Sequence, residues 1–238
     1  MHEYYAKNRA KLKKGMDAFL SLIRPELEKA SGKTYHEIFE EIWCCYDTQL
    51  LEQFPYIGGD QASGTKNLTG AYYFVAMGEV LKRYGTGMED IGHLMVYVYE
   101  RYTRKLPGLA RHLMGRIYRS PRLLSSMMRK KDEQNRKNAQ LNPGSFETET
   151  QDTPEEGFDF SYHNLVCPLS NFARAHGYEE YMPYICNLDY VNFGLLGVPL
   201  YREHTCFQSG DYCDFKLKLD AEPLSYWPPV FRQDNPYQ

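Results

Sequence analysis

The spacing of the apolar residues changes once along the chain, and this change constrains the fold more than any other feature of the sequence. Over residues 4–140, apolar residues recur every three or four positions, as at Ile42, Cys45 and Tyr46. This period is typical of helices that bury one face. Further along, it gives way to short alternating runs and short helices. The sequence therefore predicts a helical first part and a mixed second part.

Residues that break helices divide the first part. The breaks fall at 31–34, in the glycine-rich stretch 58–70, at 85–87 and at 107–108. Glycine and proline at such positions end one helix and allow the next to begin. The pattern predicts about five helices.

A polar stretch follows the last of these helices. Residues 129–154 read RKKDEQNRKNAQLNPGSFETETQDTP and contain almost no apolar residue that would anchor them to a core. Such a composition is typical of linkers. The predicted organisation is a helical region over 1–140, a linker over 141–157 and an α/β region with a Cys/Asp motif over 158–238.

The second part mixes strands and short helices. The alternation in FDFSYHNLV indicates a strand, and residues 168–176 are typical of a short helix ended by Gly177. Pro183 suits the first turn of a further helix that runs to Gly194 or Gly197. The prediction is an α+β fold, with a helical N-terminal bundle and a small C-terminal antiparallel sheet with short helices.

The clearest local signal is a hairpin near the end of the chain. VPLYREHTCFQ and DYCDFKLKL are two strand-like runs separated by Ser209 and Gly210, a pair that suits a tight turn. If these two residues form the loop, Cys206 faces Cys213 on the neighbouring strand. The same face would then carry Arg202, His204, Phe215 and Leu217.

Composition excludes several classes of function. A net charge of −3 and a pI near 6.2 give no global basic field, so we expect no nucleic-acid partner. No signal peptide and no membrane-spanning run is evident, so we expect a soluble, cytoplasmic protein with no membrane partner and with reduced thiols. Phosphate-loop and dinucleotide motifs are absent, so no nucleotide cofactor is expected.

The cysteines of the last third are the candidates for chemistry. Cys186 and Asp189 lie three residues apart on a predicted helix, where a thiol and a carboxylate share one face and suit a nucleophile with its proton acceptor. The alternative is that Cys186 packs as a small apolar residue and Asp189 caps local backbone. We assign Cys44 and Cys45 to helix packing.

A zinc site is a second reading of the same region. His204, Cys206 and Cys213 form a cluster of suitable ligands if the hairpin register holds, and Cys167 or Cys186 would complete a four-coordinate site. The spacing lacks the paired C-x-x-C loops of sequence-level zinc motifs. The alternative is a set of buried thiols at a sheet interface.

Two segments of the last third form a longer pattern, CPLSNFARAHGYEEYMPYICNLDY and, after a strand, GDYCDFKLK. The pattern resembles the L-2-aminothiazoline-4-carboxylic acid hydrolase family. The matching positions are Cys167, Gly177, Cys186, Asp189, Gly210, Cys213, Asp214 and Phe215. The passage GGDQASGTKNLTGAYYFVAMGEVL in the helical half is also similar, so the resemblance covers most of the chain.

The resemblance implies a hydrolase that opens a small cyclic amidine. Water adds to C2 of L-2-aminothiazoline-4-carboxylate, the ring opens, and N-carbamoyl-L-cysteine results. This chemistry requires an activated nucleophile at C2, a carboxylate for the amidinium nitrogens and a cation for the substrate's own carboxylate.

The predicted site follows from these requirements. Asp189 suits the amidinium, Cys186 or Cys213 suits the thiolate or its support, and His204 suits a proton shuttle to the departing sulfur. The predicted catalytic residues are Cys167, Cys186, Asp189, His204 and Cys213. The predicted residues for the substrate carboxylate are Arg202 and Arg174.

A second resemblance gives the alternative function. Glu203, Cys206 and Cys213, with a glycine between the cysteines, are similar to the zinc-binding end of 4-vinyl reductase-type small-molecule-binding domains. That resemblance implies a zinc-containing sensor without catalysis. A purely structural or interaction protein is the third hypothesis, and it leaves these cysteines without a chemical role.

Overall fold

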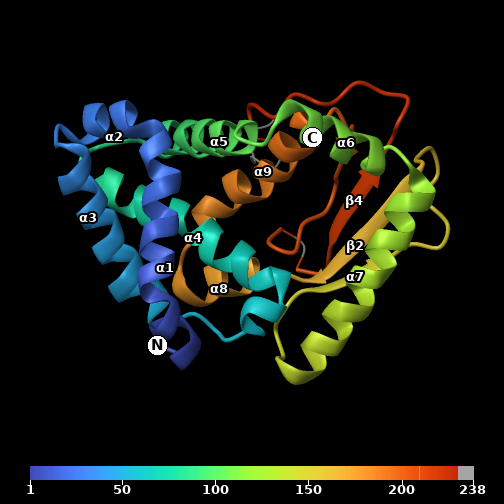
Figure 1. Cartoon of the computed structure of the whole chain (residues 1–238), viewed down its shortest axis with the longest axis horizontal. Coiled ribbons are helices and arrows are strands. Elements are labelled where there is room, and N and C mark those ends of the chain that lie inside the picture. The colour runs from blue at the N-terminus through green and yellow to red at the C-terminus, as the bar shows by residue number, and fades with distance from the viewer. Residues whose placement is uncertain (209, 230–238) are drawn as a thin grey trace. The chain divides into compact units, whose positions relative to one another are not determined.

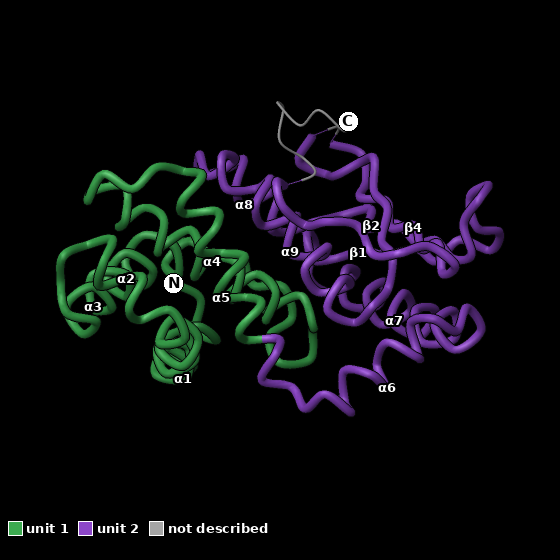
Figure 2. Tube along the Cα trace, turned by 90° about the horizontal axis from the view of Figure 1, so that it is seen from above, with its two compact units in different colours: residues 1–102 green, residues 103–238 purple. Residues whose placement is uncertain are grey.

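The computed structural model in Figure 1 describes residues 1–208 and 210–229. The chain divides into two compact units, residues 1–102 and residues 103–238, which Figure 2 shows in different colours.

The first unit consists of helices. Its α-helices are α1 (Glu3–Leu20), α2 (Arg24–Ser31), α3 (Tyr35–Cys45), α4 (Ser63–Arg83) and most of α5 (Met88–Arg104). Three shorter segments are the 3-10 turn η1 (Ser21–Ile23), the π-helical η2 (Tyr46–Leu51) and the 3-10 turn η3 (Gly59–Gln61).

Local sequence sets the boundaries of α2 and α3. Gly32 ends α2 with a φ of 68°, a left-handed conformation that costs glycine little. Thr34 then begins α3 with a capping box, in which its hydroxyl accepts the Glu37 amide and the Glu37 carboxylate accepts the Thr34 amide. Two helices therefore meet at a sharp turn of three residues.

The core of the first unit surrounds α4, which is apolar on most of its surface. Tyr46 is fully buried and donates its hydroxyl to the carbonyl of Thr69 at 3.1 Å. Its ring lies 5.0 Å from that of Tyr73, and such tilted aromatic pairs add to the area that they bury. The polar end of a large buried aromatic residue is thus satisfied by a helix carbonyl.

The second unit combines helices with one sheet. Its helices are α6 (Gly108–Tyr118), α7 (Pro121–Leu141), α8 (Pro168–His176), the 3-10 turn η4 (Glu179–Tyr181) and α9 (Met182–Leu195). Its strands are β1 (Glu147–Thr150), β2 (Phe160–Val166), β3 (Leu200–Tyr201) and β4 (Cys213–Leu217).

The sheet is antiparallel throughout, in the order β1-β2-β4-β3. All five residues of the central strand β4 are buried. Tyr162 on β2 lies directly opposite Phe215 on β4, and the two rings stack with centroids 4.5 Å apart. This pair fixes the register of the two strands that carry the site.

Helix α6 packs closely against the chain that follows α9. A Cβ added at Gly115 would lie 2.4 Å from the carbonyl oxygen of Leu196, so only glycine allows this approach. Three residues on, the Tyr118 ring meets Phe193 edge to face at 5.4 Å. Arg119 donates to the carbonyl of Gly197 at 2.8 Å. One face of α6 therefore packs against other residues of the second unit.

The α+β fold predicted from the sequence is confirmed. The strand predicted in FDFSYHNLV is β2, the helix predicted over 168–176 is α8, and Gly177 ends it with a φ of 76°. Pro183 lies in the first turn of α9, as predicted. These elements are specified by local periodicity and by capping residues.

The first 141 residues contain more helices than the five predicted, namely α1 to α7. The two missed boundaries are at prolines. Pro25 lies in the first turn of α2, and Pro121 is the first residue of α7. Proline lacks the amide that an interior helical position needs but suits a first turn, so each of these residues starts a helix.

The predicted linker over 141–157 is corrected by the structure, because it contains β1, which pairs with β2. Asp132 on α7 explains why so polar a segment is ordered. Its buried carboxylate accepts the Thr148 hydroxyl at 2.6 Å, and the Thr150 hydroxyl and amide at 2.6 and 2.9 Å. Hydrogen bonds to the Asp132 carboxylate therefore hold β1 in place, where apolar side chains would otherwise do so.

The boundary between the two compact units also differs from the predicted one, since it falls after residue 102. Across the described residues, no helix has both the length and the apolar character that crossing a bilayer would require.

Candidate active site

Cys206 and Cys213 contact each other, but not as a strand pair. The amide of Cys206 donates to Sγ of Cys213 at 3.2 Å, and Sγ of Cys206 lies 3.5 Å from the carbonyl oxygen of Asn164 on β2. Both cysteines are buried, with 5% and 4% of their surface exposed. The predicted proximity is confirmed.

The predicted hairpin register is wrong. Leu200 faces Leu217 in the structure, whereas a Cys206–Cys213 pair would require it to face Leu219. Strand β3 ends at Tyr201, so Cys206 lies in a turn beyond the ladder. Ser209, one of the two predicted loop residues, lies outside the described residues.

Asp214 is the physical reason for this difference. Its carboxylate is 1% exposed and accepts the amide of Glu203 at 2.9 Å and that of His204 at 2.7 Å. Lys216 lies 3.1 Å from the same carboxylate. Because Asp214 binds these amides, the chain leaves the ladder after Tyr201 and turns so that the Cys206 amide reaches Cys213.

Cys213 is the thiol whose ionisation is favoured. Hydrogen bonding with the Cys206 side chain, together with the Arg202 charge and the Cys206 amide, lowers its pKa to about 7 against the opposing effect of burial. The pKa of Cys206 is raised, since the pair favours the negative charge on one sulfur only. Cys213 is therefore the member of the pair that ionises first, and the thiolate is the nucleophilic form of cysteine.

Arg202 and Asp189 form an ion pair beside this thiolate. Nη1 of Arg202 lies 2.8 Å from Oδ2 of Asp189 and 3.3 Å from the carbonyl of Cys186. The guanidinium also lies over the Phe215 ring at 4.2 Å, and Nε donates to the carbonyl of Asp214 at 3.0 Å. The Arg202 side chain is 1% exposed, so these contacts hold it in place.

Asp189 is the solvent-facing member of the pair. Its side chain is 44% exposed, and burial by the surrounding protein raises its pKa while Arg202 and Lys131 oppose that shift. Its Oδ1 makes no hydrogen bond to any described residue. A carboxylate that is both reachable from solvent and surrounded by protein is suited to binding a small cation.

The other two cysteines of the last third flank Cys213. Cys186 lies one turn before Asp189 on α9, is half-buried, and has its pKa raised well above the ordinary value by burial. Cys167 precedes α8, and burial followed by the Cys213 charge raises its pKa to about 12. Both thiols are therefore protonated, and the charge on Cys213 raises the pKa of each.

Cys44 and Cys45 belong to the first unit, on α3. Cys45 is buried and its pKa is raised to about 11, mainly by burial. Cys44, by contrast, is exposed.

Several predicted residues lie at the edge of the cluster. The His204 side chain is exposed, with its ring 5.4 Å from that of Tyr212. Arg174 donates to the carbonyls of Cys206 and Phe207 at 2.7 and 2.8 Å. Arg174 thus supports the turn that contains Cys206.

The predicted metal ligands do not converge. The Glu203 carboxylate binds Lys216 at 2.6 Å, and the Glu203 side chain is exposed. Over residues 1–208 and 210–229, no three His, Cys, Asp or Glu side chains are arranged to hold a metal ion. The donor set proposed for zinc, Glu203 with Cys206 and Cys213, therefore does not fit.

Lys131 was not predicted from the sequence. It lies on α7, it is half-buried, and its charge is close enough to Asp189 to oppose the shift in the pKa of that group. Burial lowers the pKa of Lys131. The signal for its inward position is the spacing of Leu124, Met128 and Asn135, whose buried side chains follow one face of α7.

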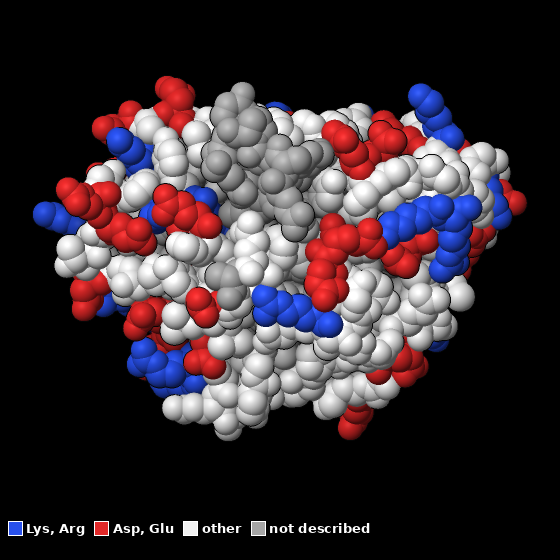
Figure 3. All heavy atoms as spheres, turned by 180° about the vertical axis from the view of Figure 1, so that it is seen from behind, with Lys and Arg blue, Asp and Glu red and all other residues white. Residues whose placement is uncertain are grey.

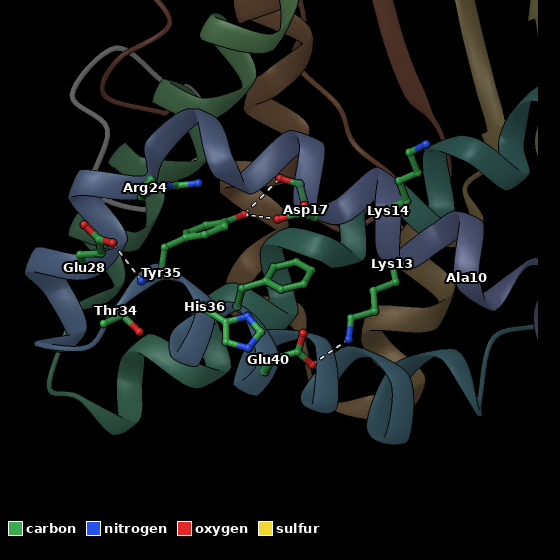
Figure 4. Close-up of a pocket in the computed structure, with 11 residues that line it drawn as sticks. Ala10, Lys13, Lys14, Asp17, Arg24, Glu28, Thr34, Tyr35, His36 and Glu40 are labelled. Atoms are coloured by element: carbon green, nitrogen blue, oxygen red, sulfur yellow. Dashed lines mark hydrogen bonds and ion pairs between the residues drawn. The ribbon is translucent and has the colours of Figure 1, made fainter.

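A surface pocket lies in the first unit. It has a volume of about 800 Å³ and lies among α1, α2 and α3 (Figure 4). Several of its polar groups are already paired, since Lys13 binds Glu40 at 2.7 Å and the Tyr35 hydroxyl binds Asp17 at 2.8 Å. None of the six cysteines lines it.

The arrangement in the second unit supports nucleophilic chemistry. It combines a thiolate, a buried cation beside it, a carboxylate open to solvent and a half-buried lysine. Comparison with known proteins gives one match: a family described as L-2-amino-thiazoline-4-carboxylic acid hydrolase matches residues 69–217. No curated protein and no solved structure matches the chain.

Proposed function

The chain belongs to the L-2-amino-thiazoline-4-carboxylic acid hydrolase family, and from this premise we propose that it hydrolyses a small cyclic amidine such as L-2-aminothiazoline-4-carboxylate, with Cys213 as the nucleophile. The observation that carries the proposal is the lowered pKa of Cys213, about 7, next to an Arg202–Asp189 pair. The matched segment contains all of these residues.

In the first step, the Cys213 thiolate attacks C2 of the ring. The C2–S bond then breaks, its electron pair stays on the ring sulfur, and the substrate becomes an S-linked isothiourea on Cys213. The Arg202 guanidinium stabilises the thiolate before attack and again when it leaves. Cys186 and Cys167, both protonated, add no negative charge next to the attacking sulfur.

In the second step, water adds to the same carbon and Cys213 departs as the thiolate. The water oxygen becomes the carbonyl of N-carbamoyl-L-cysteine, and its two hydrogens complete the product, one of them on the liberated thiol. No redox change takes place. His204, exposed on the neighbouring turn, is the imidazole that we assign to proton transfer.

Two charged side chains, Asp189 and Lys131, bind the substrate. Oδ1 of Asp189 accepts an N–H of the amidinium, while Oδ2 stays on Arg202. We assign the substrate carboxylate to Lys131, because Arg202 is held by other contacts and Arg174 supports the Cys206 turn. This choice replaces the two arginines that were predicted from the sequence.

The experiment that tests the proposal is a rapid-quench reaction followed by mass spectrometry of the intact chain. We expect a transient species heavier by one substrate molecule, located on the peptide that contains Cys213. Cys213→Ser should lose both this species and turnover, while Cys44→Ser, in the helical unit, should retain both. Turnover at the wild-type rate in Cys213→Ser would overturn the proposal.

A further inference from the structure

Although the net charge of the chain is −3, one segment contains only positively charged side chains. From Thr103 to Lys131 the chain contains lysines and arginines but no aspartate or glutamate. Four of these cations are exposed and make no ion pair with any residue that the structure describes; they are Lys105, Arg116, Arg122 and Lys130. The stretch covers α6 and the first half of α7.

Large apolar side chains are exposed on the same two helices. Leu109, Leu113 and Ile117 follow one another at four-residue spacing on α6 and are 71%, 50% and 40% exposed. On α7, Leu123 and Met127 repeat the spacing and are 58% and 40% exposed. We call these five residues, with the four cations above, the basic apolar face.

This face points away from the second unit's own core. Gly115, Tyr118 and Arg119 contact the segment around Leu196 and Gly197, so they occupy the opposite side of α6. At 100° per residue, Leu113 and Ile117 project on the other side of the helix. Figure 2 shows α6 and the start of α7 along one edge of the second unit.

We propose that the basic apolar face docks onto the surface of a bilayer that contains anionic phospholipids. A helix with a leucine stripe flanked by lysine and arginine is suited to lying in the membrane interface, where the apolar side chains enter the acyl boundary and the cations meet lipid phosphates. Five exposed apolar residues and three exposed cations on α6 and α7, with Lys105 just before α6, supply both contributions.

Charge distinguishes this partner from the other occupants of such a face. In a two-fold dimer formed through it, the cations of one copy would face those of the other, which opposes association. A phosphate backbone would satisfy the cations but would leave Leu109 and Leu123 in water. The face of the molecule that Figure 3 shows carries acidic and basic side chains close together.

The test is flotation of the full chain with vesicles. We expect binding to vesicles of phosphatidylcholine mixed with phosphatidylserine, little binding to phosphatidylcholine alone, and release as salt is added. Arg116→Gln with Arg122→Gln should weaken the partition coefficient roughly 30-fold, at about 1 kcal/mol for each cation. Leu109→Gln with Leu113→Gln should abolish flotation.

Control variants outside the basic apolar face test whether a loss of vesicle binding is specific to that face. Leu141→Gln removes a leucine that is 81% exposed at the far end of α7, and Lys14→Gln with Lys218→Gln removes two exposed cations elsewhere. Both controls should float like the wild type. A circular dichroism melt of each variant shows whether lost binding reflects lost folding.

Three outcomes would overturn the proposal. The first is a wild-type chain that does not float with anionic vesicles. The second is equal loss of binding in the controls and in the variants of the face. The third is a wild-type dimer, seen by light scattering, that Leu109→Gln with Leu113→Gln converts to a monomer, because the face would then join two copies of the chain.

Discussion

The amide of Cys206 lies 3.2 Å from Sγ of Cys213 and donates a hydrogen bond to it. A backbone donor is fixed by the turn that contains it, so this bond favours the thiolate without requiring a second titrating base. The Cys206 thiol and Arg202 favour the same state.

The first prediction concerns thiolate formation. The ultraviolet absorbance of the folded chain should show a thiolate that titrates with a midpoint near pH 7, because Cys213 has a pKa of about 7. Cys213→Ser should remove this step, and Cys45→Ser should leave it in place, since Cys45 has a pKa of about 11. A wild-type titration without any thiolate at neutral pH would contradict this prediction.

The same shift makes stability depend on pH. Folding lowers the pKa of Cys213, so the unfolded chain holds more protons there between pH 7 and roughly pH 8.5. The free energy of unfolding should therefore rise over this window, by at most about 2 kcal/mol, and this contribution is lost as the pH falls through 7. Urea midpoints of wild type and Cys213→Ala, compared at each pH, isolate the contribution.

The second prediction concerns Asp189. Asp189→Asn keeps the size and removes the charge, so it should cost roughly 2–4 kcal/mol of transition-state stabilisation, measured as kcat/KM on aminothiazoline carboxylate. It should also lower the melting temperature, because Arg202 is 1% exposed and loses its partner. Unchanged kcat/KM would exclude Asp189 from amidinium binding.

A double variant separates these two effects. Arg202→Met removes the buried charge and keeps a long apolar side chain over Phe215. In Asp189→Asn with Arg202→Met, the melting temperature should recover relative to Asp189→Asn alone, while turnover stays low. Recovery of both would mean that Asp189 acts only by keeping Arg202 in place.

The third prediction concerns the contact between α7 and β1. Asp132→Ala removes an acceptor for three hydrogen bonds from Thr148 and Thr150, so it should cost roughly 2–4 kcal/mol of unfolding free energy. Glu133→Ala is the matched control, because its carboxylate is exposed and binds only Lys137. Urea denaturation of the two variants should differ clearly, and equal midpoints would contradict the role of Asp132.

The fourth prediction concerns the close approach at α6. Gly115→Ala would place a Cβ 2.4 Å from a backbone oxygen, which neither segment accommodates without moving, so we expect a loss of roughly 1–3 kcal/mol. Gly108→Ala, at the start of the same helix, has no atom within 4 Å and should be neutral or slightly stabilising. Thermal melts decide between them, and equal melting temperatures would show that α6 does not pack as described.

The sequence predicted the elements whose signals are local. Apolar alternation located β2, and a proline start with a glycine stop located α8. The sequence also predicted that Cys206 lies next to Cys213, although the predicted register of the two strands was wrong. The true register depends on Asp214 binding the amides of Glu203 and His204, a long-range contact that strand alternation does not encode.

The parts that the sequence missed depend on partners distant along the chain. β1 is held by the Asp132 carboxylate, which accepts hydrogen bonds from Thr148 and Thr150, 16 and 18 residues further along the chain and beyond the window in which periodicity is visible. Lys131 was missed for the same reason, because Asp189, the group whose pKa it influences, lies far along the chain. Arg202 and Asp189 were assigned separately to the substrate, whereas the structure pairs them.

Cys213 and Asp214 are neighbours on β4, and each contacts the same turn, one through its sulfur and the other through its carboxylate. The charge on the sulfur therefore reports on the order of that turn. Any ligand or substitution that loosens residues 203–206 withdraws an amide from Cys213 and raises its pKa. The ultraviolet absorbance of the thiolate therefore reports whether residues 203–206 keep this turn, and the measurement needs no added label.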